Sequence, residues 1–268
     1  MMMELEKLVS AVSQSAKYRH VSPMLIARIG AQELAKRPNL KAAVKATKNK
    51  LHQIGGAYLD AQPDYQVALT ELETAVTNET TLRQFCRRWM QQHTSTRERL
   101  PILDEFYTTT LADLPDVHRV LDLACGLNPL ARPWMPLSPD VTYIASDIYA
   151  DLVMFVDLFL RRTGGNGRAE LRDLIGEPPV ETADLILLLK TLPVLEQIEK
   201  GAATRLLDAL NARYLLITFP ARSLGGRNKG MVPHYEAQFQ QWIAGRGWQV
   251  RRFEFATELA FLVETAVS

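Results

Sequence analysis

The feature that most constrains the fold is a succession of short apolar segments that begins at Arg119. Stretches with a helical or loop pattern separate them. They are RVLDLAC (119–125), VTYIASDI (141–148), AELRDL (169–174), ADLILLLK (183–190), ARYLLITFP (212–220), WQVRRFEF (248–255) and ELAFLVET (258–265). The middle segments are nearly continuous apolar runs, which are typical of parallel strands buried on both faces. Strands that alternate with crossover segments predict a doubly wound α/β domain.

The last two segments predict a different connection. Only two residues separate them, which is too few for a crossover, so we expect an antiparallel pair. Five parallel strands that end in such a pair match the Rossmann-like, seven-stranded sheet of class I S-adenosylmethionine-dependent methyltransferases. We expect this methyltransferase domain at residues 106–268.

The first hundred residues have helical periodicity instead. Ser22-Pro23 and Pro38-Asn39 are typical helix starts, and Gly55-Gly56 predicts a break. Further helices are expected at about 64–76 and 80–91. The spacing of Ser95 and Glu98 predicts a capping box that opens a helix through Leu103, Phe106 and Tyr107. We therefore expect a helical extension over residues 1–105.

The net charge of +1 conceals an asymmetry along the chain. Residues 1–60 carry ten Lys and Arg against four Asp and Glu, whereas the remainder carries 21 against 26. Lys41, Lys45 and Lys48 recur at i, i+4 and i+7, so they share one helix face. Such a segment favours an anionic partner, although a solvated helical surface has the same pattern.

Composition excludes several classes of protein. The chain is 47% apolar and 23% charged, as ordinary globular proteins are. Two cysteines, Cys86 and Cys125, exclude a disulfide scaffold and a four-cysteine zinc site, and no metal is expected. The apolar run Leu185 to Leu189 is far short of a membrane span, and the first residues lack the apolar core of a signal peptide. We expect a cytoplasmic protein with no membrane partner.

Small and acidic residues follow the first two predicted strands. In an open α/β sheet the ligand binds at the carboxyl ends of the strands. There the turn in VLDLACGLNPLA (120–131) supplies Ala124 and Gly126, which let the backbone approach a ligand. Asp147 ends the second strand, 21 residues after Gly126, where a carboxylate accepts hydrogen bonds from ribose hydroxyls. This pattern predicts a nucleotide-type cofactor.

Asp173 and Lys190 end the third and fourth predicted strands. Together with Asp147 they place three polar side chains at successive strand ends, which converge on one crevice. A nicotinamide-dependent dehydrogenase would use the same crevice. Its usual G-x-G-x-x-G turn is absent, which disfavours that class.

Seven stretches of the chain also occur, in the same order, in one known family. They are KYR (17–19), LHQIGGAY (51–58), HTSTRERL (93–100), VLDLACGLNPLA (120–131), LLLKTLPVLE (187–196), TFPARSLGGRNKGM (218–231) and TELAFLV (257–263). Through them the chain resembles, over nearly its whole length, the aminoglycoside-resistance methyltransferases that modify N7 of guanine 1405 in 16S rRNA. The resemblance implies S-adenosylmethionine as donor, S-adenosylhomocysteine as product, and 16S rRNA within the assembled 30S subunit as substrate.

The resemblance implies roles for individual residues. Arg99 and Tyr58 are expected to hold the methionine carboxylate of the cofactor, and Lys190 to lie beside the transferred methyl group. Asp147 corresponds to the ribose site and Asp173 to the adenine site. The expected cofactor-binding residues are Tyr58, His93, Ser95, Thr96, Arg99, Ala124, Gly126, Asp147, Ile148, Asp173, Leu174, Lys190 and Thr191.

The expected RNA contacts are all basic. The segment from Pro220 to Tyr235 has two adjacent glycines and no acidic residue, and it follows the fifth predicted strand. A basic loop beside a methyl donor suits an anionic polymer. The expected RNA-binding residues are Lys17, Arg19, Lys41, Lys45, Lys48, Arg222, Arg227 and Lys229, and the expected catalytic residues are Lys190, Arg222 and Lys229.

The implied reaction needs no general base. Guanine N7 carries a lone pair in its neutral form, so positioning and electrostatics suffice. Cys125 lies in the cofactor turn, and we expect it to pack rather than to act as a nucleophile. Two alternatives stay open: a methyltransferase of the same fold that acts on another rRNA position, and a non-catalytic RNA-binding protein.

Overall fold

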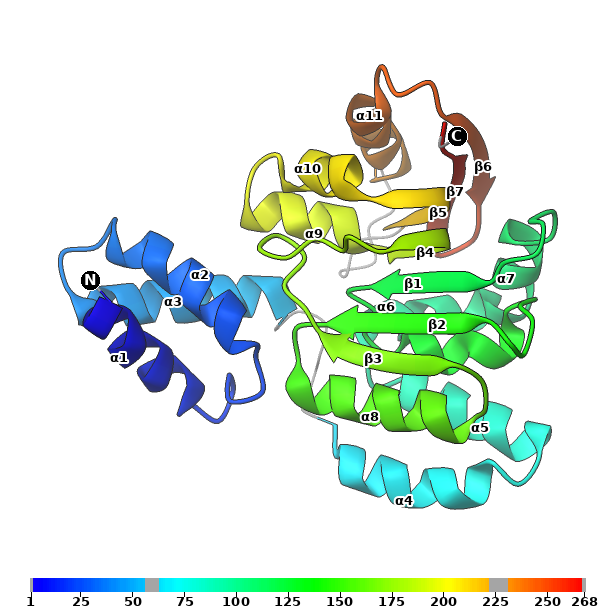
Figure 1. Cartoon of the computed structure of the whole chain (residues 1–268), viewed down its shortest axis with the longest axis horizontal. Helices are drawn as coiled ribbons and strands as arrows, with labels where there is room; N and C mark the ends of the chain where they lie inside the picture. The colour runs from blue at the N-terminus through cyan, green and yellow to red at the C-terminus, as the bar shows by residue number, and fades with distance from the viewer. Residues whose placement is uncertain (1, 56–62, 222–230, 267–268) are drawn as a thin grey trace.

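A computed structural model of the chain describes residues 2–55, 63–221 and 231–266. One twisted sheet forms its centre, helices cover both faces of the sheet, and three N-terminal helices stand to one side (Figure 1). Two of the predicted helix starts are confirmed by their caps. The Ser22 hydroxyl accepts a hydrogen bond from Leu25 N at 3.5 Å, and Asn39 Oδ1 accepts one from Ala42 N at 2.9 Å.

Seven α-helices precede the sheet within the described residues 2–55 and 63–118. They are α1 (Met2–Ser13), α2 (Pro23–Leu34), α3 (Leu40–Gly55), α4 (Tyr65–Ala75), α5 (Glu79–Met90), α6 (Thr94–Arg99) and α7 (Leu103–Thr110). The predicted helices over 64–76 and 80–91 are thus confirmed. The predicted break at Gly55-Gly56 stays a prediction, because residues 56–62 lie outside the described residues.

The predicted capping box at Ser95 is wrong. Helix α6 begins at Thr94, and a short 3₁₀ turn (Leu100–Ile102) separates it from α7. The Ser95 hydroxyl lies 2.9 Å from Nδ1 of His93, and the Glu98 carboxylate bonds to Lys190 Nζ at 2.6 Å. Because the helix begins at Thr94, Ser95 lies inside it and cannot cap it, and Glu98 pairs with the Lys190 ammonium instead.

The sheet has seven strands in the order β3-β2-β1-β4-β5-β7-β6. They are β1 (Arg119–Leu123), β2 (Thr142–Asp147), β3 (Gly167–Leu171), β4 (Thr182–Leu189), β5 (Asn211–Pro220), β6 (Gln249–Glu254) and β7 (Glu258–Glu264). Strand β7 runs antiparallel to β5 and β6, and strands β1 to β5 are parallel. This topology confirms the class I methyltransferase sheet. Strand β3 ends at Leu171, so Asp173 follows it in a turn rather than ending the strand.

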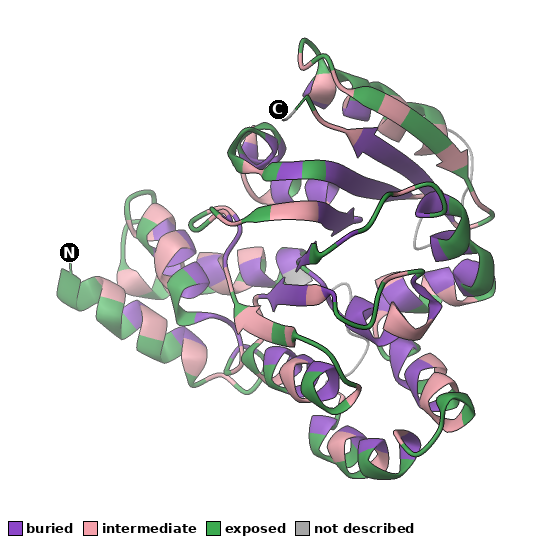
Figure 2. Cartoon of the chain, turned by 45° about the vertical axis from the view of Figure 1, so that its right-hand side comes forward, coloured by how far each residue is buried: buried purple, intermediate pink, exposed green. Residues whose placement is uncertain are grey.

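Each face of the sheet has its own hydrophobic core. Helices α4, α5 and α7 cover one face together with α8 (Ala150–Arg162), through side chains such as Phe85, Phe106 and Phe155. The opposite face packs against α9 (Thr191–Ile198), α10 (Ala202–Ala209) and α11 (Met231–Ile243). The middle strands are almost wholly buried between these layers (Figure 2).

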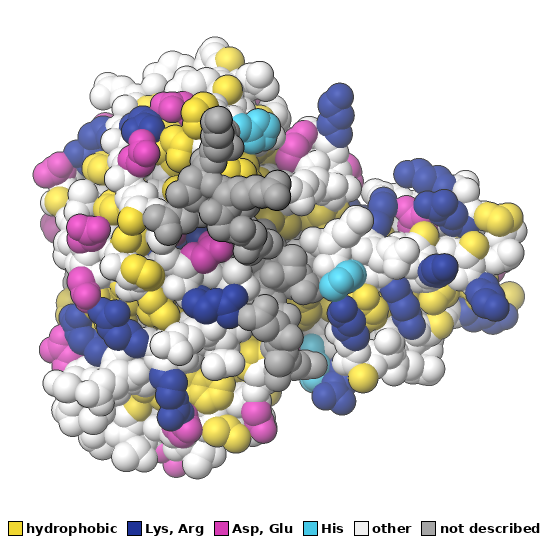
Figure 3. Space-filling model, turned by 180° about the vertical axis from the view of Figure 1, so that it is seen from behind, with side chains coloured by type: hydrophobic (Ala, Val, Ile, Leu, Met, Phe, Trp, Pro, Cys, Tyr) yellow, Lys and Arg dark blue, Asp and Glu magenta, His cyan; other side chains and the backbone are white. Residues whose placement is uncertain are grey.

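Helices α1 to α3 form a separate unit, which we call the three-helix unit. Its core includes Leu8, Ile26, Ile29 and Ala43. Lys and Arg side chains gather over its surface (Figure 3). Helices α4 to α7 pack on the sheet instead, so the cores divide between α3 and α4. The domain boundary expected at residue 105 falls inside the part that packs on the sheet, because helical periodicity does not reveal which core a helix joins.

The three-helix unit is attached at the carboxyl edge of the sheet. Ser22 N donates to Ile148 O at 2.8 Å, and Ala150 N donates to His20 O at 2.7 Å. Val21 and Tyr149 form an isolated antiparallel bridge between these two bonds. The three-helix unit is therefore joined to the rest of the protein just beyond the end of β2. Within the described parts of the chain, no helix has the length and apolarity needed to span a bilayer.

Candidate active site

A pocket opens at the carboxyl ends of the central strands, against the three-helix unit. It holds about 780 Å³ of empty space, a figure that includes its open mouth. Nine residues expected at the cofactor site line it: His93, Ser95, Ala124, Asp147, Ile148, Asp173, Leu174, Lys190 and Thr191.

Sequence reasoning missed several other lining residues. They are Leu25, Ile54, Tyr149, Arg172, Leu189, Val194, Leu195 and Ile198. Most are apolar residues of α2, α3 and α9, where an apolar position at helical spacing indicates only a buried face. Only the docking of the three-helix unit brings Leu25 and Ile54 to the strand ends.

The turn after β1 shows how a single glycine can replace the usual glycine-rich turn of a nucleotide-binding site. Ala124 and Gly126 both have positive φ, at 52° and 51°. A Cβ on Gly126 would lie 2.8 Å from the imidazole of His93, so no larger residue fits there. Ala124 tolerates the left-handed conformation at some cost and is exposed in the pocket. The turn thus leaves its backbone open to a ligand.

Asp147 fixes the two turns that border the pocket. Its Oδ2 accepts from Gly126 N at 2.9 Å, and its Oδ1 accepts from Ile148 N at 2.7 Å and Tyr149 N at 3.3 Å. Burial raises the pKa of this carboxyl above its usual value, and the three backbone N–H groups oppose that rise. Each oxygen keeps acceptor capacity, which fits hydroxyl donors on a ligand.

Asp173 is held by the three-helix unit. Arg28 of α2 donates from Nε to Oδ2 at 2.6 Å and from Nη2 to Oδ1 at 3.0 Å, a bidentate pair. The same guanidinium reaches Glu199 at 3.4 Å. Arg28 stands in none of the motifs that suggested the site. Its partner is 145 positions away, so no local sequence pattern indicates the pair.

Lys190 is strained and firmly held. It adopts a left-handed backbone conformation, with φ at 61°, and such strain costs about 1–3 kcal/mol. Its N–H bonds to Thr218, and its Nζ reaches Glu98 at 2.6 Å, the Ser95 carbonyl at 3.3 Å and Glu258 at 3.6 Å. The buried ammonium therefore has a defined position at the pocket wall.

The structure does not bring Arg99 to the pocket. Its guanidinium, 1% exposed, bonds twice to Glu258, at 2.7 and 3.1 Å, and once to Asn128 Oδ1 at 2.8 Å. Thr96 is also buried elsewhere, where its hydroxyl donates to Met90 O at 2.6 Å. These contacts leave Arg99 directed at Glu258 rather than at a ligand, and the expected carboxylate contact stays a prediction.

Two buried carboxyl groups in this region differ in protonation. Burial raises the pKa of Glu258, but Arg99 and Lys190 outweigh burial, so its pKa lies below the usual value. Burial raises the pKa of Asp122 to about 7, although bonds from Asn128 and Tyr143 oppose the shift. Glu258 is therefore a carboxylate that balances two cations, whereas Asp122 is partly protonated near neutrality.

His93 is neutral at physiological pH. Burial, followed by the nearby charges of Lys190 and Arg99, lowers its pKa to about 4. Its ring lies over Gly126, and its Nδ1 contacts Ser95. It can therefore shape the pocket without adding a charge.

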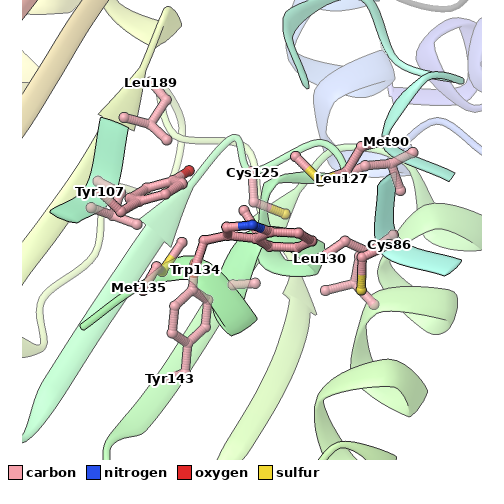
Figure 4. Packing of buried hydrophobic residues seen from close by; sticks show 14 of the residues in the cluster. Cys86, Met90, Tyr107, Cys125, Leu127, Leu130, Trp134, Met135, Tyr143 and Leu189 are labelled. Atoms are coloured by element: carbon pink, nitrogen blue, oxygen red, sulfur yellow. The ribbon is translucent and has the colours of Figure 1, made fainter. Parts of the chain in front are cut away.

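Cys125 packs in the core, as expected. It is 5% exposed, and burial raises the pKa of its thiol well above the usual value. In Figure 4 its sulfur lies among Trp134, Leu127 and Leu130, beneath the turn. The described residues contain no group of three or more His, Cys, Asp and Glu that could hold a metal ion.

Four expected site residues lie outside the described residues. They are Tyr58, Arg222, Arg227 and Lys229. Their roles stay predictions from the sequence.

Comparison with known proteins identifies the family. The model of the ribosomal RNA methyltransferase (FmrO) family matches residues 14–262. The chain belongs to this family. It is 40% identical over 264 residues to the 16S rRNA (guanine(1405)-N(7))-methyltransferase of Micromonospora echinospora, covering 97% of this chain and 96% of that relative. The protein of the same name from Serratia marcescens is 32% identical, with 98% and 99% covered.

Solved structures of family members have the same fold. The crystal structure of the 16S rRNA methyltransferase RmtF in complex with S-adenosyl-L-homocysteine gives a TM-score of 0.81 at 35% identity, covering 98% of each chain. The 16S rRNA methylase RmtB gives a TM-score of 0.82 at 28% identity, covering 97% of this chain and 98% of the other. The likeness to these two structures extends over nearly the whole chain, the three-helix unit included.

Replacing the two buried carboxyl groups by amides should lower the unfolding free energy by very different amounts. Glu258→Gln leaves two buried cations without their shared anion, which typically costs about 3–5 kcal/mol. Asp122→Asn keeps an oxygen that accepts from Asn128 and Tyr143, so its unfolding free energy should change by less than about 1.5 kcal/mol. Urea denaturation at pH 7 measures both. Equal losses of unfolding free energy in the two variants would contradict the assignment of a full charge to Glu258 and a partial charge to Asp122.

Removing Arg28 should weaken binding of S-adenosylmethionine, a donor implied by the family resemblance, about tenfold, which is 1.4 kcal/mol. Asp173 would lose its bidentate partner, and the pocket wall formed by α2 would be less firmly attached. Calorimetric titration of Arg28→Ala measures this. Arg37→Ala is the matched control, because Arg37 lies just beyond α2 and pairs with Glu33 away from the pocket. Equal affinity in both variants would show that the pair is irrelevant to the pocket.

His93 should make stability depend on pH. Its folded pKa lies below its unfolded value of about 6.5, so the unfolded chain binds the proton first as pH falls. Above pH 6.5, the unfolding free energy of the wild type should exceed that of His93→Gln by a constant amount. This difference should decrease as the pH falls toward 4, by at most about 1.4 kcal/mol per pH unit. His118→Gln, at an exposed site, is the control. A lead that is constant between pH 6.5 and 4.5 would refute the shift.

Proposed function

We propose that this protein transfers a methyl group from S-adenosylmethionine to N7 of guanine 1405 in the 16S rRNA of the 30S subunit, in the cytoplasm. The observation that carries the proposal is that nine of the thirteen residues expected at a cofactor site, from strand ends and family motifs, line one pocket. The likeness to relatives that carry this name supports the same substrate.

The described residues fit the proposed cofactor. Asp147 offers oxygens to ribose hydroxyls, and the turn at Ala124 leaves the backbone open beside them. Apolar side chains from α9 and the three-helix unit, such as Val194, Leu25 and Ile54, form walls suited to an adenine ring. Bound there, S-adenosylmethionine supplies a methyl group on a positively charged sulfur.

The chain's own residues then position the reactants. Guanine N7 attacks with its lone pair, so no side chain has to accept a proton first. His93 is neutral, and Lys190 is fixed between two carboxylates. Such a preorganised set of charges suits a reaction in which charge moves and no proton does.

The three-helix unit provides a basic surface for RNA. Lys17, Arg19, Lys41 and Lys45 are exposed, and Lys48 is half-buried on the same helix face. Many Lys and Arg side chains are visible over this unit (Figure 3). Because the unit also walls the pocket, phosphates bound to it would hold the rRNA beside the methyl donor.

Incubation with 30S subunits and labelled donor, followed by mapping of the modified nucleotide, tests the proposal. A single methyl group at N7 of guanine 1405 is expected. A methyl group elsewhere would support the alternative of another rRNA position. Binding of 30S subunits without any transfer would support a non-catalytic RNA-binding protein.

The lysines of α3 should act on RNA and not on the donor. Each neutralised phosphate adds about 0.7–0.9 to the slope of log affinity against log salt. A variant with Lys41, Lys45 and Lys48 changed to Ala should bind 30S subunits less tightly and with a shallower slope, as measured by filter binding. Donor affinity should be unchanged by calorimetry.

A second triple variant is the matched control. Arg161, Lys200 and Arg213 are also exposed and lie at other places on the fold, outside the three-helix unit and the pocket lining. Their replacement by Ala removes the same charge and should leave the salt slope closer to that of wild type. Equal slopes in both triple variants would mean that net charge, and not the α3 face, governs binding.

A further inference from the structure

The target base itself has a pattern that a protein can read. Along one edge of guanine, N7 and O6 are acceptors, and the neighbouring N1–H and N2 amino group are donors. An enzyme that modifies a base extrudes it from the helix and reads its Watson–Crick edge by hydrogen bonds. A cation opposite O6 and a carboxylate opposite N1 and N2 would complement guanine.

Such a pair lies at the pocket, with Lys190 in its wall and Glu98 behind Lys190. Lys190 Nζ lies 2.6 Å from the Glu98 carboxylate. The Lys190 side chain is 4% exposed and that of Glu98 is 27% exposed, so the carboxylate is the more accessible of the two. Lys190 lines the pocket, and Glu98 lies one hydrogen bond beyond it.

The Lys190 ammonium has other partners besides Glu98. Lys190 Nζ also reaches Glu258, which is fully buried, and the carbonyl of Ser95. Arg99 anchors Glu258 from the other side. Glu98 can therefore share its acceptor oxygens with an incoming base while Lys190 keeps a counter-ion.

We propose that Glu98 selects guanine as the base to be methylated, which rests on the function proposed above. Its carboxylate accepts the N1–H and N2 amino hydrogens, while Lys190 donates to O6. In this arrangement the methyl group faces N7, Lys190 faces O6 and Glu98 faces N1. Adenine presents an amino group to the ammonium and a lone pair to the carboxylate, so both contacts become repulsive.

The same contact favours the reaction. The N7 lone pair forms the new bond to the methyl carbon, and the electrons of the broken C–S bond stay on sulfur. The positive charge thereby moves from the cofactor to the guanine ring, and no proton is transferred. A carboxylate bonded to N1–H interacts more strongly with that ring as its charge develops, so Glu98 stabilises the transition state more than the bound substrate.

Glu98→Gln distinguishes base reading from a merely structural role. A carboxamide can donate a hydrogen bond to the lone pair of adenine N1, which a carboxylate cannot do. Binding is measured to 30S subunits whose plasmid-encoded 16S rRNA carries guanine or adenine at position 1405. The variant should lose about 10-fold to 100-fold in methylation rate on guanine, and its preference for guanine over adenine in binding should shrink by at least tenfold.

The expected controls are specific. Calorimetric donor affinity should stay within twofold of wild type, and Glu105→Gln, at an exposed site on α7, should behave as wild type throughout. If Glu98→Gln weakens binding to both kinds of subunit by the same factor, or to neither, Glu98 does not read the base. If wild-type protein does not methylate guanine 1405 at all, the proposed function fails, and that result is independent of Glu98.

Glu98→Asp keeps the inference testable if the amide variant does not fold. It retains the charge and draws the carboxylate back by one methylene. We expect it to fold and to bind the donor normally, with methylation reduced at least tenfold because N1 and N2 are out of reach. Full methylation activity in Glu98→Asp would overturn the inference.

Discussion

The buried ion pair between Arg99 and Glu258 is the interaction on which the site depends. Both side chains are almost without exposure, so each loses its hydration on folding, a cost of several kcal/mol per ion. Two short hydrogen bonds of the guanidinium offset that cost, and its third bond continues to Asn128 and from there to Asp122. The pair thus connects α6 with the start of β7 and with the turn beneath the pocket.

This anchor determines where Lys190 lies. Glu258 faces Arg99 on one side and Lys190 on the other, at 2.7 and 3.6 Å. Lys190 also has a strained backbone, which persists only where surrounding bonds over-determine it. The Lys190 ammonium therefore has little freedom to move, because its backbone is fixed at the end of β4 and its charge is paired with the buried Glu258. Preorganisation of this kind lowers the reorganisation needed during a reaction.

Strand ends were predictable from sequence, whereas their partners were not. Asp147 and Lys190 were identified because a polar residue at the end of an apolar strand must reach the ligand edge of a parallel sheet. Arg28 and Glu258 were missed because their partners are 145 and 159 positions away, and local pattern carries no information about such pairs. The motif around Arg99 predicts a contact with the cofactor carboxylate, and the structure shows its guanidinium bonded to Glu258. Helical periodicity likewise revealed α1 to α7 and left undecided which of them pack on the sheet.

The arrangement of charge also explains why this site has ion pairs where many enzymes have a titrating base. A reaction in which a neutral nitrogen takes a methyl group from a sulfonium has no proton to remove, so a group that exchanges protons near neutrality would add nothing. His93 is correspondingly held neutral, and Lys190 is held between Glu98 and Glu258. What such a reaction needs is a fixed arrangement of charges around a positive charge that changes place. Glu98 and Glu258 balance Lys190 and Arg99 beside the pocket, and these four groups keep their positions while the charge moves from one ligand to the other.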